Sequence, residues 1–123
     1  MSQAAGSSTR QPHSTIVVHQ SYDEYSVDIA RANYGQSHMN NTEVHEDGWL
    51  GNPYKVGEDG DREEVVAKFT QDFLDRIQED KEFRHAVAEL KGERLGCWCQ
   101  KAHAEGPLCH GEVIKATIEK LHN

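Results

Sequence analysis

The three cysteines of this chain lie within thirteen residues, from Cys97 to Cys109. Cys97 and Cys99 belong to a short apolar run, residues 94–99, that is typical of a strand, so their side chains should point to the same face. Cys109 and His110 stand where the next helix is expected to begin. Two thiols from a strand end and a Cys-His pair from a helix start can converge on one point. We therefore expect a functional site there.

Zinc binding is the first of three chemistries that suit this cluster. Zn²⁺ is held in tetrahedral geometry by thiolates and imidazoles, so Cys97, Cys99 and Cys109 with His110 form a candidate zinc site. Adjacent residues such as Cys109 and His110 rarely ligate one metal, because their side chains are expected to diverge. His103, in the intervening loop, is therefore the alternative fourth ligand.

A reactive thiol and simple packing are the other two interpretations. A cysteine near a helix N-terminus with a histidine beside it, as Cys109 is, lies where a thiolate is favoured. Three small buried residues can also pack without any chemistry. A disulfide is the least favoured chemistry of the cluster, because a bridge between Cys97 and Cys99 within one strand has poor geometry. The sequence leaves the choice among metal, thiol and packing open.

Charge and composition narrow the classes of partner. The formal net charge is -8, from 21 acidic and 13 basic residues, which disfavours tight non-specific nucleic-acid binding but allows a small nucleotide. No apolar run approaches the roughly 20 residues of a membrane span, so no membrane association is expected. An odd number of clustered cysteines does not form a secreted disulfide framework, and we expect a cytoplasmic protein. Residues 1–13, rich in Ser, Gln and Ala, are expected to be a disordered tail.

The hydrophobic pattern predicts one domain over residues 14–123, with two strands, a long polar connection, two helices, a strand and a last helix. Asp61 and Glu64 have the spacing of a capping box at the start of the first helix. Its inward face should hold six apolar residues: Val65, Val66, Phe69, Phe73, Leu74 and Ile77. The expected strands are 14–19, 25–31 and 94–99, and the expected helices are 61–78, 81–91 and 111 onward.

This order of elements predicts an α/β fold with a short, mainly parallel sheet packed by three helices. A helical connection between the strands around Ile29 and Leu95 favours parallel pairing through a crossover. In such sheets ligands bind beyond the carboxyl ends of the strands. Arg31 and Cys99 lie at two such ends, so we expect them to border one site.

Several motifs resemble those of a known family. They are the segments 25–31 (YSVDIAR), 51–54 (GNPY), 61–64 (DREE), 90–99 (LKGERLGCWC) and 109–113 (CHGEV). Together they resemble the domain-of-unknown-function 4326 family over about Val17 to Leu121. The resemblance implies a source among bacteria, archaea or their viruses. It also implies a link to nucleotide or DNA-base modification, including deazaguanine-type bases.

Three polar residues outside the cysteine cluster are candidate ligand-binding residues. Arg31 can bind a phosphate or carboxylate with two parallel hydrogen bonds, or lie on the surface at a strand end. Asn52 can bind a base edge, but Gly51-Asn52-Pro53 more simply predicts a turn that also lines the site. The helix dipole disfavours an arginine at a helix start, so a bound anion would explain the presence of Arg62 there. The alternative is a solvated first-turn residue.

Two functions follow as hypotheses. In the first, the chain is a zinc- or thiol-dependent enzyme on a nucleobase or nucleotide, with Arg31, Asn52 and Arg62 holding the substrate. In the second, zinc is structural, and the domain binds a small anionic ligand or a protein partner without turnover.

Overall fold

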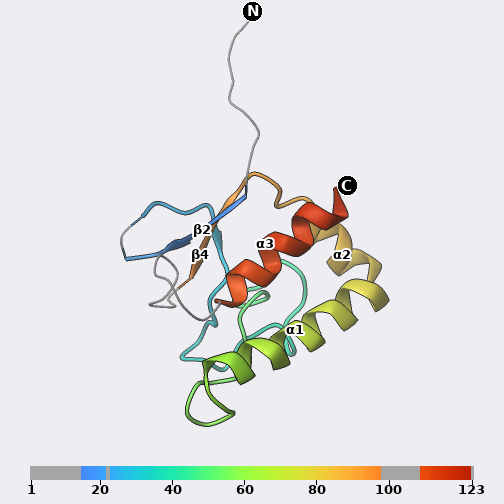
Figure 1. The fold of residues 1–123 in the computed structure, drawn as a ribbon. Helices are drawn as coiled ribbons and strands as arrows, with labels where there is room; N and C mark the ends of the chain where they lie inside the picture. Colours follow the sequence, from blue (N-terminus) through green and yellow to red (C-terminus); the bar gives the residue numbers. More distant parts are fainter. Residues whose placement is uncertain (1–14, 22, 98–108, 123) are drawn as a thin grey trace, which may run out of the picture.

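The computed structural model describes residues 15–21, 23–97 and 109–122. Its elements are β2 (Ile16–His19), β3 (Val27–Asp28), α1 (Arg62–Glu79), α2 (Lys81–Ala88), β4 (Arg94–Cys97) and α3 (His110–Leu121). In the described residues the strands form one parallel sheet in the order β2-β4-β3, and the helices group on one side of it (Figure 1). The predicted α/β fold is confirmed. The expected tail, residues 1–13, lies outside the described residues.

A short link between β2 and β3 crosses over the central strand β4. Parallel strands usually need a connection of about a dozen residues or more, yet residues 20–26 suffice here. The crossing point is Gly96, where an added Cβ would lie 2.6 Å from Cγ of Tyr25 and 2.9 Å from Cγ of Gln20. The absence of a side chain at Gly96 therefore lets the link pass closely over β4. The link also brings the end of β3 beside the end of β4.

Helix α1 begins as the sequence predicts. The Asp61 side chain accepts from the backbone N–H of Glu64 at 2.9 Å, and the Glu64 side chain accepts from the backbone N–H of Asp61 at 2.8 Å. Five of the six expected inward residues are buried, but Leu74 is 44% exposed. That expectation was wrong because Phe73 and Ile77 define the core face, and Leu74 lies about 100° around the helix from Phe73.

Element bounds differ from the expected ones for local reasons. The second strand keeps only Val27–Asp28, because the Asp28 carboxylate accepts from the backbone N–H of Ala30 at 2.9 Å and turns the chain out of the ladder. Helix α2 ends at Ala88 rather than residue 91, since the Leu90 N–H bonds the carbonyl of Val87 in a tighter turn. Helix α3 starts one residue earlier than expected, with Cys109 as its N-cap.

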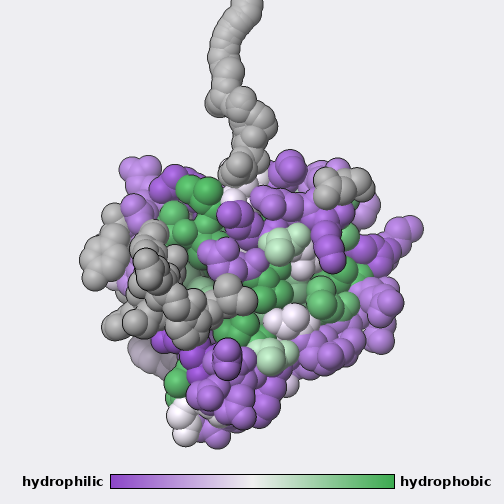
Figure 2. Space-filling view, in the orientation of Figure 1, coloured by the Kyte–Doolittle hydropathy of each residue, from purple (hydrophilic) through white to green (hydrophobic). Residues whose placement is uncertain are grey.

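The core lies between the sheet and the helices, and α3 packs against β2, β4, α1 and α2. Gly111 lets the start of α3 approach the sheet closely, because an added Cβ there would lie 2.8 Å from the Val17 side chain and 2.9 Å from the Ile29 side chain. Hydrophilic residues surround a smaller apolar area near the middle of the face shown in Figure 2. Within the described residues no helix has the length and apolar character that crossing a membrane requires.

Candidate functional site

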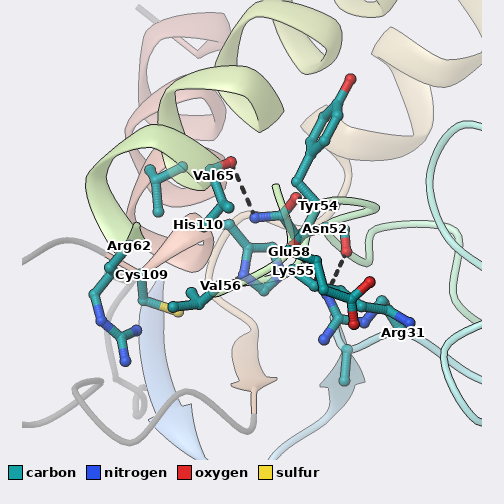
Figure 3. A pocket seen from close by; sticks show the side chains of 12 residues that line it. Arg31, Asn52, Tyr54, Lys55, Val56, Glu58, Arg62, Val65, Cys109 and His110 are labelled. Atoms are coloured by element: carbon teal, nitrogen blue, oxygen red, sulfur yellow. Dashed lines mark hydrogen bonds between the residues drawn. The ribbon is translucent and has the colours of Figure 1, made fainter. Parts of the chain in front are cut away.

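A cavity of about 450 Å³ opens beyond the carboxyl ends of the parallel strands, where α/β folds bind their ligands. Four segments line it: the link after β3, the stretch between Asn52 and Glu58, the first turns of α1, and the start of α3. In Figure 3, Arg62 and Cys109 lie on one side, Arg31 and Lys55 on the other, and His110 between them. The lining residues that the structure describes are Ala30, Arg31, Asn52, Tyr54, Lys55, Val56, Glu58, Arg62, Val65, Val66, Cys109 and His110.

Arg31 connects the link after β3 to the neighbouring turn. Its Nη1 donates to the carbonyl oxygen of Asn52 at 2.7 Å and to that of Tyr54 at 3.1 Å. Gly51 allows this contact, because a Cβ there would come within 2.7 Å of the Arg31 backbone. Two neutral acceptors therefore orient the guanidinium at the cavity.

Asn52 is a structural residue of the same turn. Its side-chain oxygen accepts from the backbone N–H of Tyr54 at 2.9 Å, and its side-chain nitrogen donates to the carbonyl of Val65 at 3.3 Å. The side chain is almost fully buried. These bonds agree with the predicted turn that lines the site, and they use one of the two amide hydrogens and one lone pair of the amide oxygen. Binding of a base edge by Asn52 stays a prediction.

Arg62 is the first residue of α1 and lines the cavity. The sequence suggested that a bound anion would explain an arginine at this helix start. The structure gives a simpler reason, because Asp61 caps the helix and Glu63 and Glu64 occupy its first turn. These carboxylates offset the unfavourable position of the guanidinium.

Lys55 is a cavity residue that no sequence motif indicated. An added Cβ on Gly35 would lie 3.7 Å from Nζ of Lys55 and 3.9 Å from Nε of Arg31, so both cations approach the same glycine. The pKa of nearby His38 is lowered by burial first and then by the positive charges of Arg31 and Lys55. Two cations therefore lie close together at this edge of the cavity in a protein that is acidic overall.

Two of the three cysteines meet at the wall of the cavity. The Sγ atoms of Cys97, at the end of β4, and Cys109, the N-cap of α3, are 3.3 Å apart, and both residues are buried. The backbone N–H of Gly111 donates to the Cys109 sulfur at 3.4 Å. Cys109 lines the cavity, whereas Cys97 is not among its lining residues. The predicted convergence of strand end and helix start is therefore present, with one of the two thiols lining the cavity.

His110 is a neutral residue with an assignable tautomer. Its Nε2 lies 2.8 Å from the carbonyl oxygen of Ile29, which only accepts, so Nε2 carries the hydrogen and Nδ1 carries the lone pair. Nδ1 is 3.7 Å from the Cys109 sulfur, so the two adjacent side chains do not diverge as expected. Burial lowers the pKa of His110 to about 4, helped by the charge of Arg31 and opposed by the bond to Ile29. At neutral pH His110 is therefore mainly uncharged, and the reactive-thiol interpretation of Cys109 stays a prediction.

The predicted zinc site depends on residues that the structure does not describe. Cys99 and His103 both lie outside the described residues. Among the described ones, no group of three or more His, Cys, Asp or Glu side chains is arranged to hold a metal ion. Zinc binding therefore stays a prediction.

Comparison with known proteins shows the family of this chain. The model of the "Domain of unknown function (DUF4326)" matches residues 14–120. The "Uncharacterized 12.4 kDa protein in nrdA-td intergenic region" of Enterobacteria phage T4 is 34% identical over 67 residues, 54% of this chain and 57% of that protein. The chain thus spans little more than half of this relative. No solved structure matches this chain significantly. The family match extends over nearly all of the described domain, and the chain belongs to the DUF4326 family.

Proposed function

We propose that the cavity binds a small anionic, nucleotide-like ligand. The observation that carries this proposal is the charge of its lining: among the lining residues that the structure describes, the cations Arg31, Lys55 and Arg62 outnumber the one carboxylate, that of Glu58. The cationic lining contrasts with a net charge of -8 for the whole chain. Such a local excess favours one anionic group and disfavours a long polyanion, which needs a broad basic surface.

Arg31 and Lys55 are the best candidates for direct contact with the anion. Neither forms an ion pair with a carboxylate in the part of the chain that the structure describes. The hydrogen bonds of Arg31 to described residues use Nη1, which leaves Nε and Nη2 to donate to a phosphate or carboxylate. The volume of about 450 Å³ lies in the usual range for a small-molecule site.

The proposal extends to chemistry on a nucleobase or nucleotide, in which Cys109 supplies a thiol at the cavity wall. DNA-base modification, including deazaguanine-type bases, is the process we propose, because the family resemblance implies it. The phage relative supports a viral setting. We also propose that the protein acts in the cytoplasm, or in the host cytoplasm if it is viral, where cysteines such as these stay reduced.

A structural zinc ion in a non-catalytic domain that binds a small anion or a protein partner is the second candidate. The separation of 3.3 Å between the sulfurs of Cys97 and Cys109 favours it. Two thiolates on tetrahedral Zn²⁺ stand about 3.8 Å apart, given Zn–S bonds of about 2.3 Å, so a small shift would suffice. Metal analysis of protein purified without added zinc tests this candidate. One zinc per chain supports it, and a folded, metal-free chain rules it out.

Thermal-shift screening tests the anion-binding proposal directly. The panel contains mononucleotides, the matching uncharged nucleosides, inorganic phosphate and duplex DNA. We expect a mononucleotide to raise the melting temperature and its nucleoside to raise it less, with a reduced effect in Arg31→Ala. Lys91→Gln is the matched control, because it removes one exposed positive charge outside the cavity. Equal shifts in Arg31→Ala and the parent chain, or salt-sensitive binding to duplex DNA alone, would contradict the proposal.

A further inference from the structure

We infer that Cys97 and Cys109 are a redox pair that closes to an intramolecular disulfide when a small-molecule disulfide such as glutathione disulfide oxidises the protein. Their sulfurs are 3.3 Å apart, and a disulfide bond is about 2.0 Å long, so closure needs a movement of about 1.3 Å. This disulfide formation goes beyond the proposed anion binding, which does not require it. The sequence disfavoured a disulfide because a bridge within one strand has poor geometry, but these two cysteines belong to different elements, so that reason does not apply to them.

The fold holds both thiols in place before any reaction. Cys97 ends the central strand, pairs in register with His19 of β2, and its carbonyl accepts from the backbone N–H of Gln20 at 3.0 Å. Cys109 is held at the start of α3, where the backbone N–H of Glu112 bonds its carbonyl oxygen at 2.9 Å. Because both ends are fixed, the second thiol is already next to the first when a mixed disulfide forms.

Different access to the two sulfurs sets the order of the steps. Cys109 lines the cavity and is 3% exposed, whereas Cys97 is fully buried and is not a lining residue. Cys109 therefore reacts first, with its sulfur already accepting a hydrogen bond from the backbone N–H of Gly111. The cationic lining also attracts glutathione disulfide, which is an anion.

The reaction balances as two thiol–disulfide exchanges. The Cys109 thiolate attacks one sulfur of glutathione disulfide, breaks its S–S bond and releases one glutathione thiolate. The Cys97 thiolate then attacks the Cys109 sulfur of the mixed disulfide and releases the second glutathione thiolate. The two cysteines lose two electrons and two protons, and two glutathione thiols form. Zinc bound to the same thiolates would block both steps.

The test is mass spectrometry of the full chain after exposure to excess glutathione disulfide, acid quenching and alkylation of the remaining thiols. Zinc content and circular dichroism are measured on the same samples. Cys99→Ser is the matched control, because it removes the one cysteine that the inference does not use. Cys97→Ser and Cys109→Ser each remove one partner. Because the readout is a covalent mass, it does not depend on whether the proposed anionic ligand binds.

We expect the parent chain and Cys99→Ser to lose two hydrogens and to give a cross-linked peptide joining Cys97 to Cys109. Cys97→Ser should stop at a glutathione adduct on Cys109, and Cys109→Ser should give no cross-link. A cross-link that includes Cys99 would overturn the inference. Thiols that stay reduced in excess oxidant would also overturn it. Protection of the thiols by one bound zinc per chain would overturn it as well. If a serine variant does not fold, the cross-linked peptide of the parent chain decides alone.

Discussion

Acid should destabilise this protein through His110. The folded state holds the pKa of this ring at about 4, against about 6.5 in the unfolded chain, because burial beside Phe69 and the positive charge of Arg31 lower it more than the bond to the carbonyl of Ile29 raises it. The unfolded state therefore binds more protons between these values, so stability falls as the pH drops below 6.5 and levels off below 4. Between pH 7 and pH 5 the loss from this group is about 2 kcal/mol, and its limit is about 3 kcal/mol.

Urea denaturation of the parent chain and His110→Gln at pH 7 and pH 5 measures this loss. Glutamine does not titrate, and its side-chain nitrogen can still donate to the carbonyl of Ile29, so the variant should lose about 2 kcal/mol less than the parent over this interval. Other titrating groups are common to both proteins and cancel in the comparison. His85→Gln, at an exposed position of α2, should follow the parent. The reasoning is refuted if His110→Gln and the parent lose the same free energy on acidification.

Five further substitutions at four positions test the local structure and packing that support the site, each by urea denaturation. Gly51→Ala should cost roughly 1–3 kcal/mol or more, because its Cβ would meet the backbone of Arg31 at 2.7 Å; an unchanged free energy of unfolding would show that the turn moves away easily. Asp61→Ala should cost about 1 kcal/mol by removing the cap of α1, while Asp61→Asn should keep most of the stabilisation that the cap provides. Equal losses of stability in the two variants would argue against a capping role. Phe73→Ala should cost about 3–5 kcal/mol and Leu74→Ala only a fraction of that, because Phe73 is fully buried and Leu74 is exposed; comparable costs would contradict the assigned helix face.

Local signals in the sequence predicted the parts of the fold that depend on neighbouring residues. The capping box of Asp61 and Glu64 is such a signal, because both hydrogen bonds lie within one turn. The order of strands and helices predicted parallel pairing, because a helical crossover leaves few alternatives. The end of β3 was placed too late, since period-two alternation does not show that the Asp28 side chain competes for the N–H of Ala30.

The candidate site was predictable only where it lies at the ends of elements. The approach of Cys97 to Cys109 follows from a strand end and a helix start at one edge of the sheet. The position of Lys55 at the cavity could not be predicted, because Lys55 lies in an irregular stretch that has no periodic sequence pattern. The state of His110 also needed the structure, because its partner, the Ile29 carbonyl, is 81 residues away in the chain.

Calorimetric titration of a mononucleotide into the parent chain and Lys55→Gln tests the central claim most directly. Lys55 is chosen because it lines the cavity and forms no ion pair with the described residues, so its replacement should leave the fold intact. We expect saturable binding of one ligand per chain. The dissociation constant should rise roughly 10- to 100-fold in Lys55→Gln, as for the loss of a charged hydrogen bond, and stay unchanged in Lys91→Gln. Absence of binding, or equal affinity in the parent chain and Lys55→Gln, would contradict an anion-binding cavity.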